Sequence, residues 1–153
     1  MSTHRPAPDG ARALLFERLD DGDPWSPEAR PFRVHDRDGL LASVARELSR
    51  LLNTRCPVAP AELAGRERTV LEYGLADWSP AAARDPAARR ALESAVRIAI
   101  EAYEPRLRAV RVTARALPGR DRELFLTVDG ELAAEGAGEP VSFPIVLAGQ
   151  VER

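Results

Sequence analysis

Residues 85–117 read DPAARRALESAVRIAIEAYEPRLRAVRVTARAL. In the first half of this stretch, apolar residues recur every three or four positions, which predicts an amphipathic helix. The helix is expected to start at Pro86, because Asp85 can cap exposed N–H groups and proline needs no N–H of its own there. After Pro105 the apolar period changes to two, which predicts a half-buried strand. The predicted buried face of the helix is Leu92, Ala95, Val96, Ala99, Ile100 and Tyr103.

The sequence before this stretch predicts a second long helix. It starts near Asp38, runs for about four turns and ends near residues 53–55. Its predicted apolar face is Leu40, Leu41, Val44, Leu48, Leu51 and Leu52. Two shorter helical segments are expected: one near the N-terminus at residues 14–19, and one turn at residues 70–75, closed by Gly74 in a left-handed cap.

The sequence after it predicts two more strands, at residues 124–128 and 141–147. Helices followed by antiparallel strands give an α+β fold: two main amphipathic helices, with short N-terminal and middle helices, packed on a small antiparallel three-stranded sheet. Residues 1–10 are expected to form a flexible tail, and residues 11–153 a single domain. Pro144 favours an edge position for the last strand, since proline cannot donate to a ladder.

Composition excludes several kinds of chemistry. All 22 basic residues are arginine, so a Schiff-base lysine or a phosphate-loop lysine is impossible. The single cysteine, Cys56, and the two histidines, His4 and His35, form no metal-binding pattern. We therefore expect no cofactor, no metal and no catalytic residue. No apolar stretch is long enough to cross a membrane, so we expect a cytoplasmic protein without direct membrane insertion.

The junction between helix and strand carries the most informative charges. Pro105 disfavours a helical conformation for Glu104, so the chain there is expected to be extended. Residues two apart in an extended chain point the same way, which places Glu104 and Arg106 on one side. Such side chains can pair with each other or reach separate partners of opposite charge. From the residues alone both readings remain open.

The predicted sheet leaves one face without a covering helix. This face is expected to carry Arg111, Thr113, Arg115, Phe125, Thr127, Ser142 and Val146. Because it is partly apolar and borders an edge strand with a proline, it suggests contact with another molecule.

Four blocks in order resemble a known family. They are Leu15-Phe16-Glu17-Arg18-Leu19, Leu51-Leu52-Asn53-Thr54-Arg55, Val70-Leu71-Glu72-Tyr73-Gly74-Leu75 and Tyr103-Glu104-Pro105-Arg106-Leu107. Their order and spacing resemble the TssE family, the small baseplate subunit of bacterial type VI secretion systems, which is itself similar to a baseplate wedge protein of contractile-tailed phages. The likeness spans residues 11–148.

The resemblance implies a structural role rather than an enzymatic one. Family members assemble with larger baseplate wedge subunits, touch the first ring of the contractile sheath and help start its polymerisation, in the cytoplasm at the inner membrane. The family's Glu-Pro-Arg signature maps onto Glu104, Pro105 and Arg106, which are then expected to be critical for assembly. Further candidate partner contacts are Asn53, Thr54 and Arg55, together with strand addition at an edge formed by Val141, Phe143 and Ile145.

Three alternatives compete with this interpretation. A phage-tail or tailocin wedge protein would use the same surfaces, and neighbouring genes would separate it from a secretion baseplate. A lysozyme-like glycoside hydrolase needs two carboxylates beside a sugar-binding cleft, but no motif places them, and Trp25 and Trp78 are the only tryptophans. Nucleic-acid binding would rest on Arg108, Arg111 and Arg115, for which a solvated or subunit-facing strand is the favoured reading. We therefore expect no nucleic-acid partner.

Overall fold

The computed structural model describes residues 11–12, 34–63, 65–78, 85–117, 120–133 and 138–148. The predicted N-terminal tail and the helix predicted at residues 14–19 lie outside this part. Two compact units are distinguished, residues 1–44 and 45–153, so the prediction of a single domain over residues 11–153 stays a prediction. In the first unit, β1 (Ala11–Arg12) pairs antiparallel with β2 (Val34–His35), and helix α2 (Arg37–Leu52) begins.

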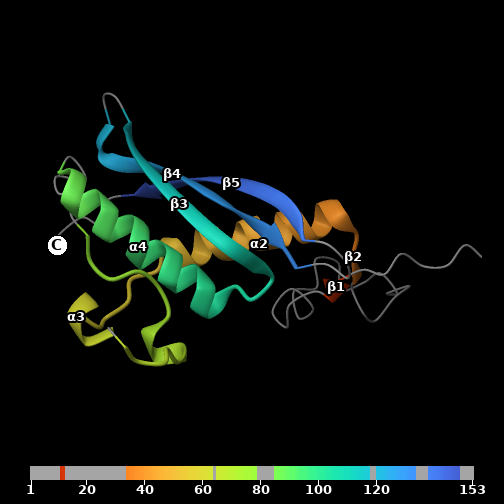
Figure 1. The fold of residues 1–153 in the computed structure, drawn as a ribbon, viewed down its shortest axis with the longest axis horizontal. Coiled ribbons are helices and arrows are strands. Elements are labelled where there is room, and N and C mark those ends of the chain that lie inside the picture. The colour runs from red at the N-terminus through yellow and green to blue at the C-terminus, as the bar shows by residue number, and fades with distance from the viewer. Residues whose placement is uncertain are drawn as a thin grey trace, which may run out of the picture. The chain divides into compact units, whose positions relative to one another are not determined.

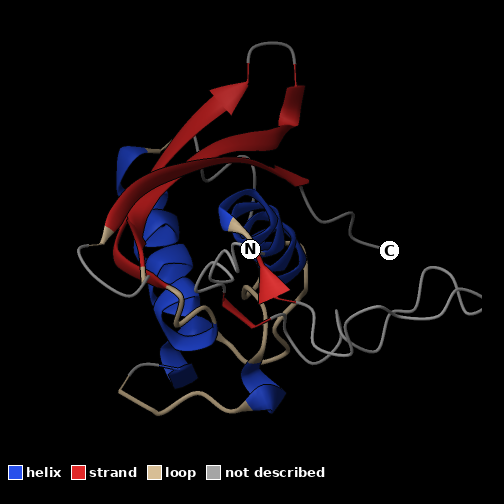
Figure 2. Cartoon of the chain, turned by 90° about the vertical axis from the view of Figure 1, so that its right-hand side faces the viewer, coloured by secondary structure: helices blue, strands red, loops and turns tan. Residues whose placement is uncertain are grey.

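The second unit contains a three-stranded sheet. Strands β3 (Leu107–Leu117), β4 (Arg120–Leu132) and β5 (Glu139–Ala148) pair antiparallel in the order β3-β4-β5 (Figure 1). Helix α4 (Pro86–Tyr103) and the part of α2 after Val44 lie on the same face of this sheet (Figure 2). Helix α3 (Pro60–Leu63) and the 3₁₀ turn η1 (Val70–Glu72) lie between them in sequence. The α+β prediction is confirmed.

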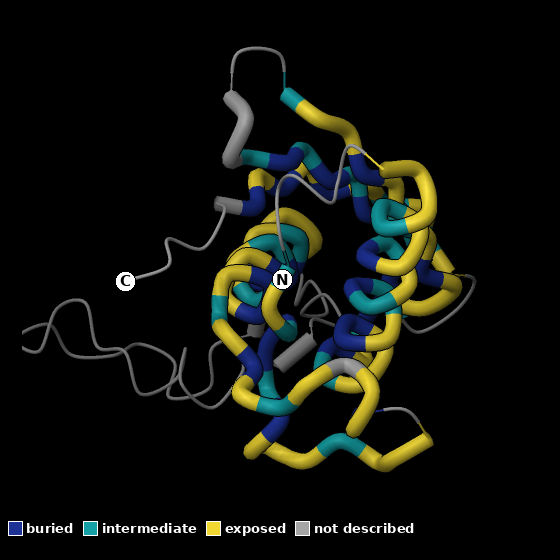
Figure 3. The backbone as a smooth tube through the Cα atoms, turned by 90° about the vertical axis from the view of Figure 1, so that its left-hand side faces the viewer, coloured by how far each residue is buried: buried dark blue, intermediate teal, exposed yellow. Residues whose placement is uncertain are grey.

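The core follows the predicted periods. Buried residues recur along one side of α4 and alternate along the strands (Figure 3). On α4 they are Leu92, Val96, Ala99 and Ile100, whereas Ala95 and Tyr103 are half-buried. On β4 and β5 they are Leu124, Leu126, Val128, Leu132, Phe143, Ile145 and Leu147. The start of α4 is also as predicted, since the N–H of Ala88 donates to Asp85 Oδ2 at 3.0 Å.

The alternation of buried and exposed residues is interrupted at the start of β3. Leu107 and Val110 are both buried although three positions separate them. The register shifts between Arg108, opposite Glu131, and Arg111, opposite Asp129, so two residues of β3 face one residue of β4. This is a β-bulge, and its first residue, Ala109, has φ 51°. The bulge turns Leu107 back onto the core side.

Replacing Ala109 by glycine is expected to stabilise the fold by about 0.5–1 kcal/mol. A left-handed alanine is strained by about 1–2 kcal/mol, and the greater freedom of glycine in the unfolded chain offsets part of the relief. Chemical denaturation monitored by circular dichroism would measure the gain. As a control, Ala114→Gly on the regular, buried part of β3 should destabilise, and a loss of stability in both variants would contradict the assigned strain.

The turn at residues 70–75 differs in detail from the prediction. A single helical turn is present, but it ends at Tyr73, which has extended angles of φ −61° and ψ 133°. The cap residue is Tyr73, and Gly74, which follows it directly, has the predicted positive φ, 112°. A Cβ on Gly74 would lie 2.5 Å from the carbonyl oxygen of Thr54. Glycine is therefore required at position 74 because the backbone of Thr54 lies close to it. The sequence around Gly74 does not indicate this contact.

Candidate functional site

The helix–strand junction holds a buried ion pair. Arg106 donates from Nε to Glu104 Oε1 at 2.7 Å and from Nη2 to Glu104 Oε2 at 2.6 Å. The backbone N–H of Arg106 adds a third bond to Oε1 at 3.2 Å. The side chains keep only 4% (Glu104) and 15% (Arg106) of their exposure. The two parallel bonds match the planar guanidinium to the carboxylate, the stronger geometry for such a pair.

Backbone bonds fix the same junction. The N–H of Glu104 closes the last turn of α4 on the carbonyl of Ile100 at 2.8 Å, although Glu104 itself has left the helical region. The N–H of Leu107 donates to the carbonyl of Glu104 at 3.1 Å, so residues 104–107 form a turn, and the prediction of an extended chain there is wrong. The N–H of Ala133 donates to the carbonyl of Arg106 at 2.7 Å. The structure therefore brings Glu104 and Arg106 together with each other, and Pro105 is exposed between them.

The second predicted set follows helix α2. Asn53 donates from Nδ2 to the carbonyl of Ser49 at 2.9 Å, and Thr54 donates from Oγ1 to the carbonyl of Arg50 at 2.7 Å. The bond from Thr54 satisfies a carbonyl near the helix end, whereas the carbonyl of Ser49 also accepts the backbone N–H of Asn53 at 3.1 Å. Arg55 is exposed and pairs with Asp77. This pair borders an open pocket of about 440 Å³, which Cys56, Pro57, Val58 and Ala59 also line.

The third predicted set lies on the edge strand β5. Phe143 and Ile145 are each 6% exposed, and Val141 is half-buried. Phe143 and Ile145 therefore fill the protein's own core, and this strand can offer a partner mainly its backbone. Strand β3 forms the opposite edge of the sheet. There, the N–H of Ala114 is already bonded, because Glu93 of α4 accepts it at 2.8 Å. The two edges are thus unequal for strand addition.

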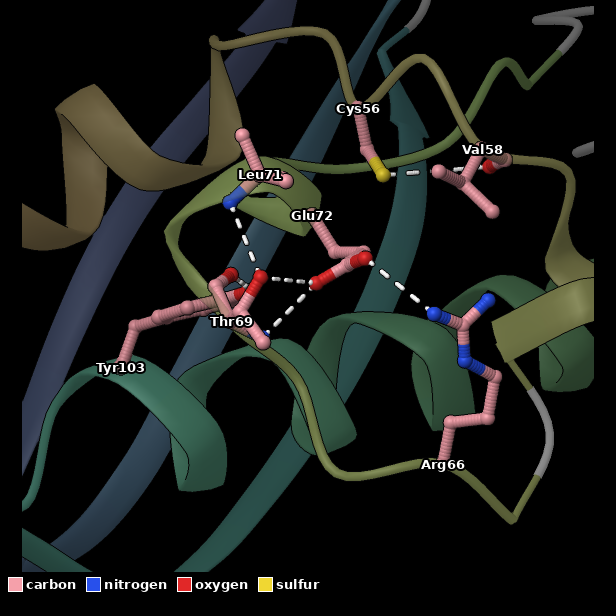
Figure 4. A network of polar contacts seen from close by, with 7 residues as sticks. All are labelled: Cys56, Val58, Arg66, Thr69, Leu71, Glu72 and Tyr103. Atoms are coloured by element: carbon pink, nitrogen blue, oxygen red, sulfur yellow. Dashed lines mark hydrogen bonds and ion pairs between the residues drawn. The ribbon is translucent and has the colours of Figure 1, made fainter.

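A polar network around η1 was not predicted from the sequence (Figure 4). Thr69 donates to Glu72 Oε2 from both its backbone N and its Oγ1, each at 2.7 Å. Arg66 lies 3.5 Å from the other carboxylate oxygen. The hydrogen bonds from Thr69 lower the pKa of Glu72, and Arg66 adds to this. The pattern Thr-x-x-Glu is a capping-box signature that the sequence does contain.

Two tyrosines connect this network to the end of α4. Tyr103 donates from its hydroxyl to the carbonyl of Thr69 at 2.7 Å. Its ring meets that of Tyr73 edge to face, with centroids 5.2 Å apart. Burial raises the pKa of both tyrosines. Since Tyr103 immediately precedes Glu104, the network and the ion pair share one helix end.

Most of the predicted site residues that the structure describes are engaged in ion pairs, hydrogen bonds and core packing. Within the described residue ranges, no group of three or more His, Cys, Asp or Glu side chains is placed to hold a metal ion. In the same part of the chain, no helix is long and apolar enough to cross a membrane. The three predicted sets lie on different elements: the α4–β3 junction, the end of α2, and β5.

Comparison with solved structures supports the fold. A chain of the baseplate complex from the type VI secretion system matches with a TM-score of 0.56 and 21% identity, over 74% of this chain and 97% of that one. A putative tail lysozyme from Geobacter sulfurreducens matches with a TM-score of 0.45 and 16% identity, over 78% of this chain and 99% of that one. No curated protein matches the chain.

A family model identifies the chain more directly. The model described as baseplate wedge protein gp25 matches residues 38–137, which is well over half of the 153 residues. The matched range contains α4, all of α2 except its first residue, and the Glu104–Arg106 pair. The resemblance inferred from the four sequence blocks is thereby confirmed, and the chain belongs to the gp25 family of baseplate wedge proteins.

Proposed function

We propose that this protein is a structural subunit of the baseplate of a type VI secretion system. It assembles with larger wedge subunits and docks the first ring of the contractile sheath, so that the sheath polymerises from the baseplate. It does so in the cytoplasm, at the inner membrane. The observation that carries the proposal is the family match over residues 38–137, which includes the junction at Glu104 and Arg106.

The geometry supports a role in assembly at three places. The buried pair and its backbone bonds hold the α4–β3 junction rigid, so that Pro105 and the exposed side of Arg106 form a preorganised contact. The Arg55–Asp77 pair, with Asn53 and Thr54 shaping the helix end beneath it, offers a second, polar contact. The backbone of β5 at Val141–Ile145 offers an edge to which a partner strand can add.

A catalytic role receives no support from the geometry. The carboxylate of the family signature, Glu104, is fully engaged by three donors of Arg106. A glycosidase acid needs a carboxyl group that is free to protonate the glycosidic oxygen beside a sugar-binding cleft. We therefore propose that the protein acts without catalysis. A phage-tail wedge protein is the runner-up, and sheath, tube and secretion-type ATPase genes beside the coding gene would favour the secretion system.

A reconstitution tests the proposed function. The full chain, co-expressed with the wedge subunits encoded beside it, is expected to co-purify with them as one complex. A strain lacking the chain should form no fluorescent sheaths, and the wild-type gene should restore them. Normal sheath assembly in the deletion strain would contradict the proposal, and so would muramidase turnover by the purified protein that disappears when one carboxylate is replaced.

A further inference from the structure

The turn η1 displays two adjacent apolar side chains. Val70 is 85% exposed and Leu71 is 75% exposed. Among the other described large apolar residues, Ile98 and Val146 are exposed by 41% and 47%. A single exposed leucine needs no explanation, but two neighbours at the tip of one turn are costly unless a partner covers them.

This apolar pair is held rigidly. The N–H of Leu71 donates to Thr69 Oγ1 at 3.2 Å, within the capping box that joins Thr69 to Glu72 (Figure 4). The hydroxyl of Tyr103 fixes the carbonyl of Thr69 from the end of α4. A turn tied from both sides loses little conformational entropy when it binds, which favours its use as a docking element.

An arginine beside the turn has one nitrogen without a hydrogen-bond partner in the described part of the chain. Arg68 is half-buried, and its Nε atom is buried without a hydrogen-bond partner among the described residues. Arg66, by contrast, pairs with Glu72. Within the same described part, no ion pair joins Arg68 to its neighbour Glu67 or to another carboxylate. Because the Arg68 side chain is only half-buried, a carboxylate arriving from outside can pair with its charge.

Local charge favours an acidic partner. The carboxylate of Glu72 accepts two bonds from Thr69 and pairs with Arg66, and among the described residues it makes no ion pair with Arg68. The positive charge of Arg68 acts on Tyr103, whose pKa it lowers against the larger effect of burial. The charge therefore lies at the point where η1 meets the end of α4.

We propose that η1 is a docking element for another baseplate subunit. That subunit covers Val70 and Leu71 with an apolar socket and places a carboxylate on Arg68. The inference rests on the proposed function, since it assigns a particular surface to the assembly partner. The partner is thus recognised by a short motif in which an acidic residue stands beside apolar ones.

Two substitutions and a control test this in the full chain, with the co-expressed wedge subunits as the probe. Leu71→Asp and Arg68→Glu are each expected to weaken binding by about tenfold or more, as loss of a buried apolar or charged contact does at an interface. Ile98→Asp, on the exposed side of α4, should leave binding within about twofold. All three variants should keep the wild-type unfolding midpoint. Wild-type binding by both test variants would overturn the inference.

A crosslinking experiment identifies the partner surface. A photoreactive residue placed at Leu71 is expected to link to one peptide of a wedge subunit, with an Asp or Glu within about four residues of the crosslink, a single turn of helix. Replacing that acidic residue by Arg should restore binding to the Arg68→Glu variant. A crosslinked peptide without an acidic residue, or no crosslink in an assembled complex, would overturn the inference. Failure of the wild-type chain to assemble would instead overturn the proposed function.

Discussion

Replacing Arg106 by alanine is expected to lower the free energy of unfolding by about 3–5 kcal/mol, because it leaves a buried carboxylate unpaired. Glu104 is 3% exposed, and two of its bonds come from the Arg106 side chain at 2.7 and 2.6 Å. Glu104→Ala should also destabilise, since the mostly buried guanidinium then loses its bidentate carboxylate. For a chain of this length the melting temperature should fall by about 10 °C.

Arg97 and Glu101 provide a matched control for burial. Arg97 Nη1 also reaches both carboxylate oxygens of Glu101, at 2.9 and 2.8 Å, one helical turn apart. These side chains, however, are 41% and 46% exposed. Arg97→Ala is therefore expected to cost no more than about 0.5 kcal/mol. Equal losses in Arg106→Ala and Arg97→Ala, measured by guanidinium denaturation, would show that burial does not set the strength of the pair.

A double substitution separates folding from assembly. Replacing both members of a buried pair by apolar residues of similar size is often neutral for stability, so Glu104→Leu with Arg106→Met should restore most of what either alanine variant loses. If the charges also act on partners, this folded double variant should still fail to co-purify with the wedge subunits. Normal co-purification would mean that the pair serves the fold of this chain alone.

The elements that the sequence predicts well are those whose signal is local. In α4, Asp85 and Pro86 mark the start, and the 3.6-residue period marks the buried face, because the same turn-by-turn geometry that forms the helix also selects its apolar stripe. The sequence also predicts that Glu104 and Arg106 lie on one side, but it leaves open whether they pair with each other. The structure brings them together through a turn, in which the N–H of Leu107 bonds the carbonyl of Glu104, and not through an extended chain.

The remaining features depend on contacts between distant segments. The bulge at Ala109 arises where Leu107 lies over Gly130, and a Cβ on that glycine would sit 2.9 Å from the Leu107 side chain. Nothing in residues 107–110 alone signals this. On β5, the alternation predicts which side chains lie on the apolar face. It does not show whether that face meets a partner or the protein's own core, and Phe143 and Ile145 lie in the core.

Replacing Gly74 by alanine is expected to destabilise the protein by roughly 2–4 kcal/mol, through strain and a clash with backbone. A Cβ there would meet the carbonyl oxygen of Thr54 at 2.5 Å and the nitrogen of Cys56 at 3.0 Å. That carbonyl accepts the N–H of Leu75 at 2.9 Å, and Cys56 donates back to the carbonyl of Leu75 at 2.9 Å. To admit the methyl group, this two-bond bridge must open, and the buried Leu75 must shift with it.

Gly65 separates the clash from backbone strain. It also has a positive φ, 73°, but a Cβ there would have no atom within 4 Å. Gly65→Ala should therefore cost only about 1 kcal/mol, the penalty for a left-handed alanine, whereas Gly74→Ala adds the loss of the bridge. Because the amides of Cys56 and Leu75 form the two bonds of this bridge, Gly74→Ala should also make hydrogen exchange at both amides faster. Equal unfolding free energies for the two variants would mean that conformation alone, and not the approach of two chain segments, requires glycine at position 74.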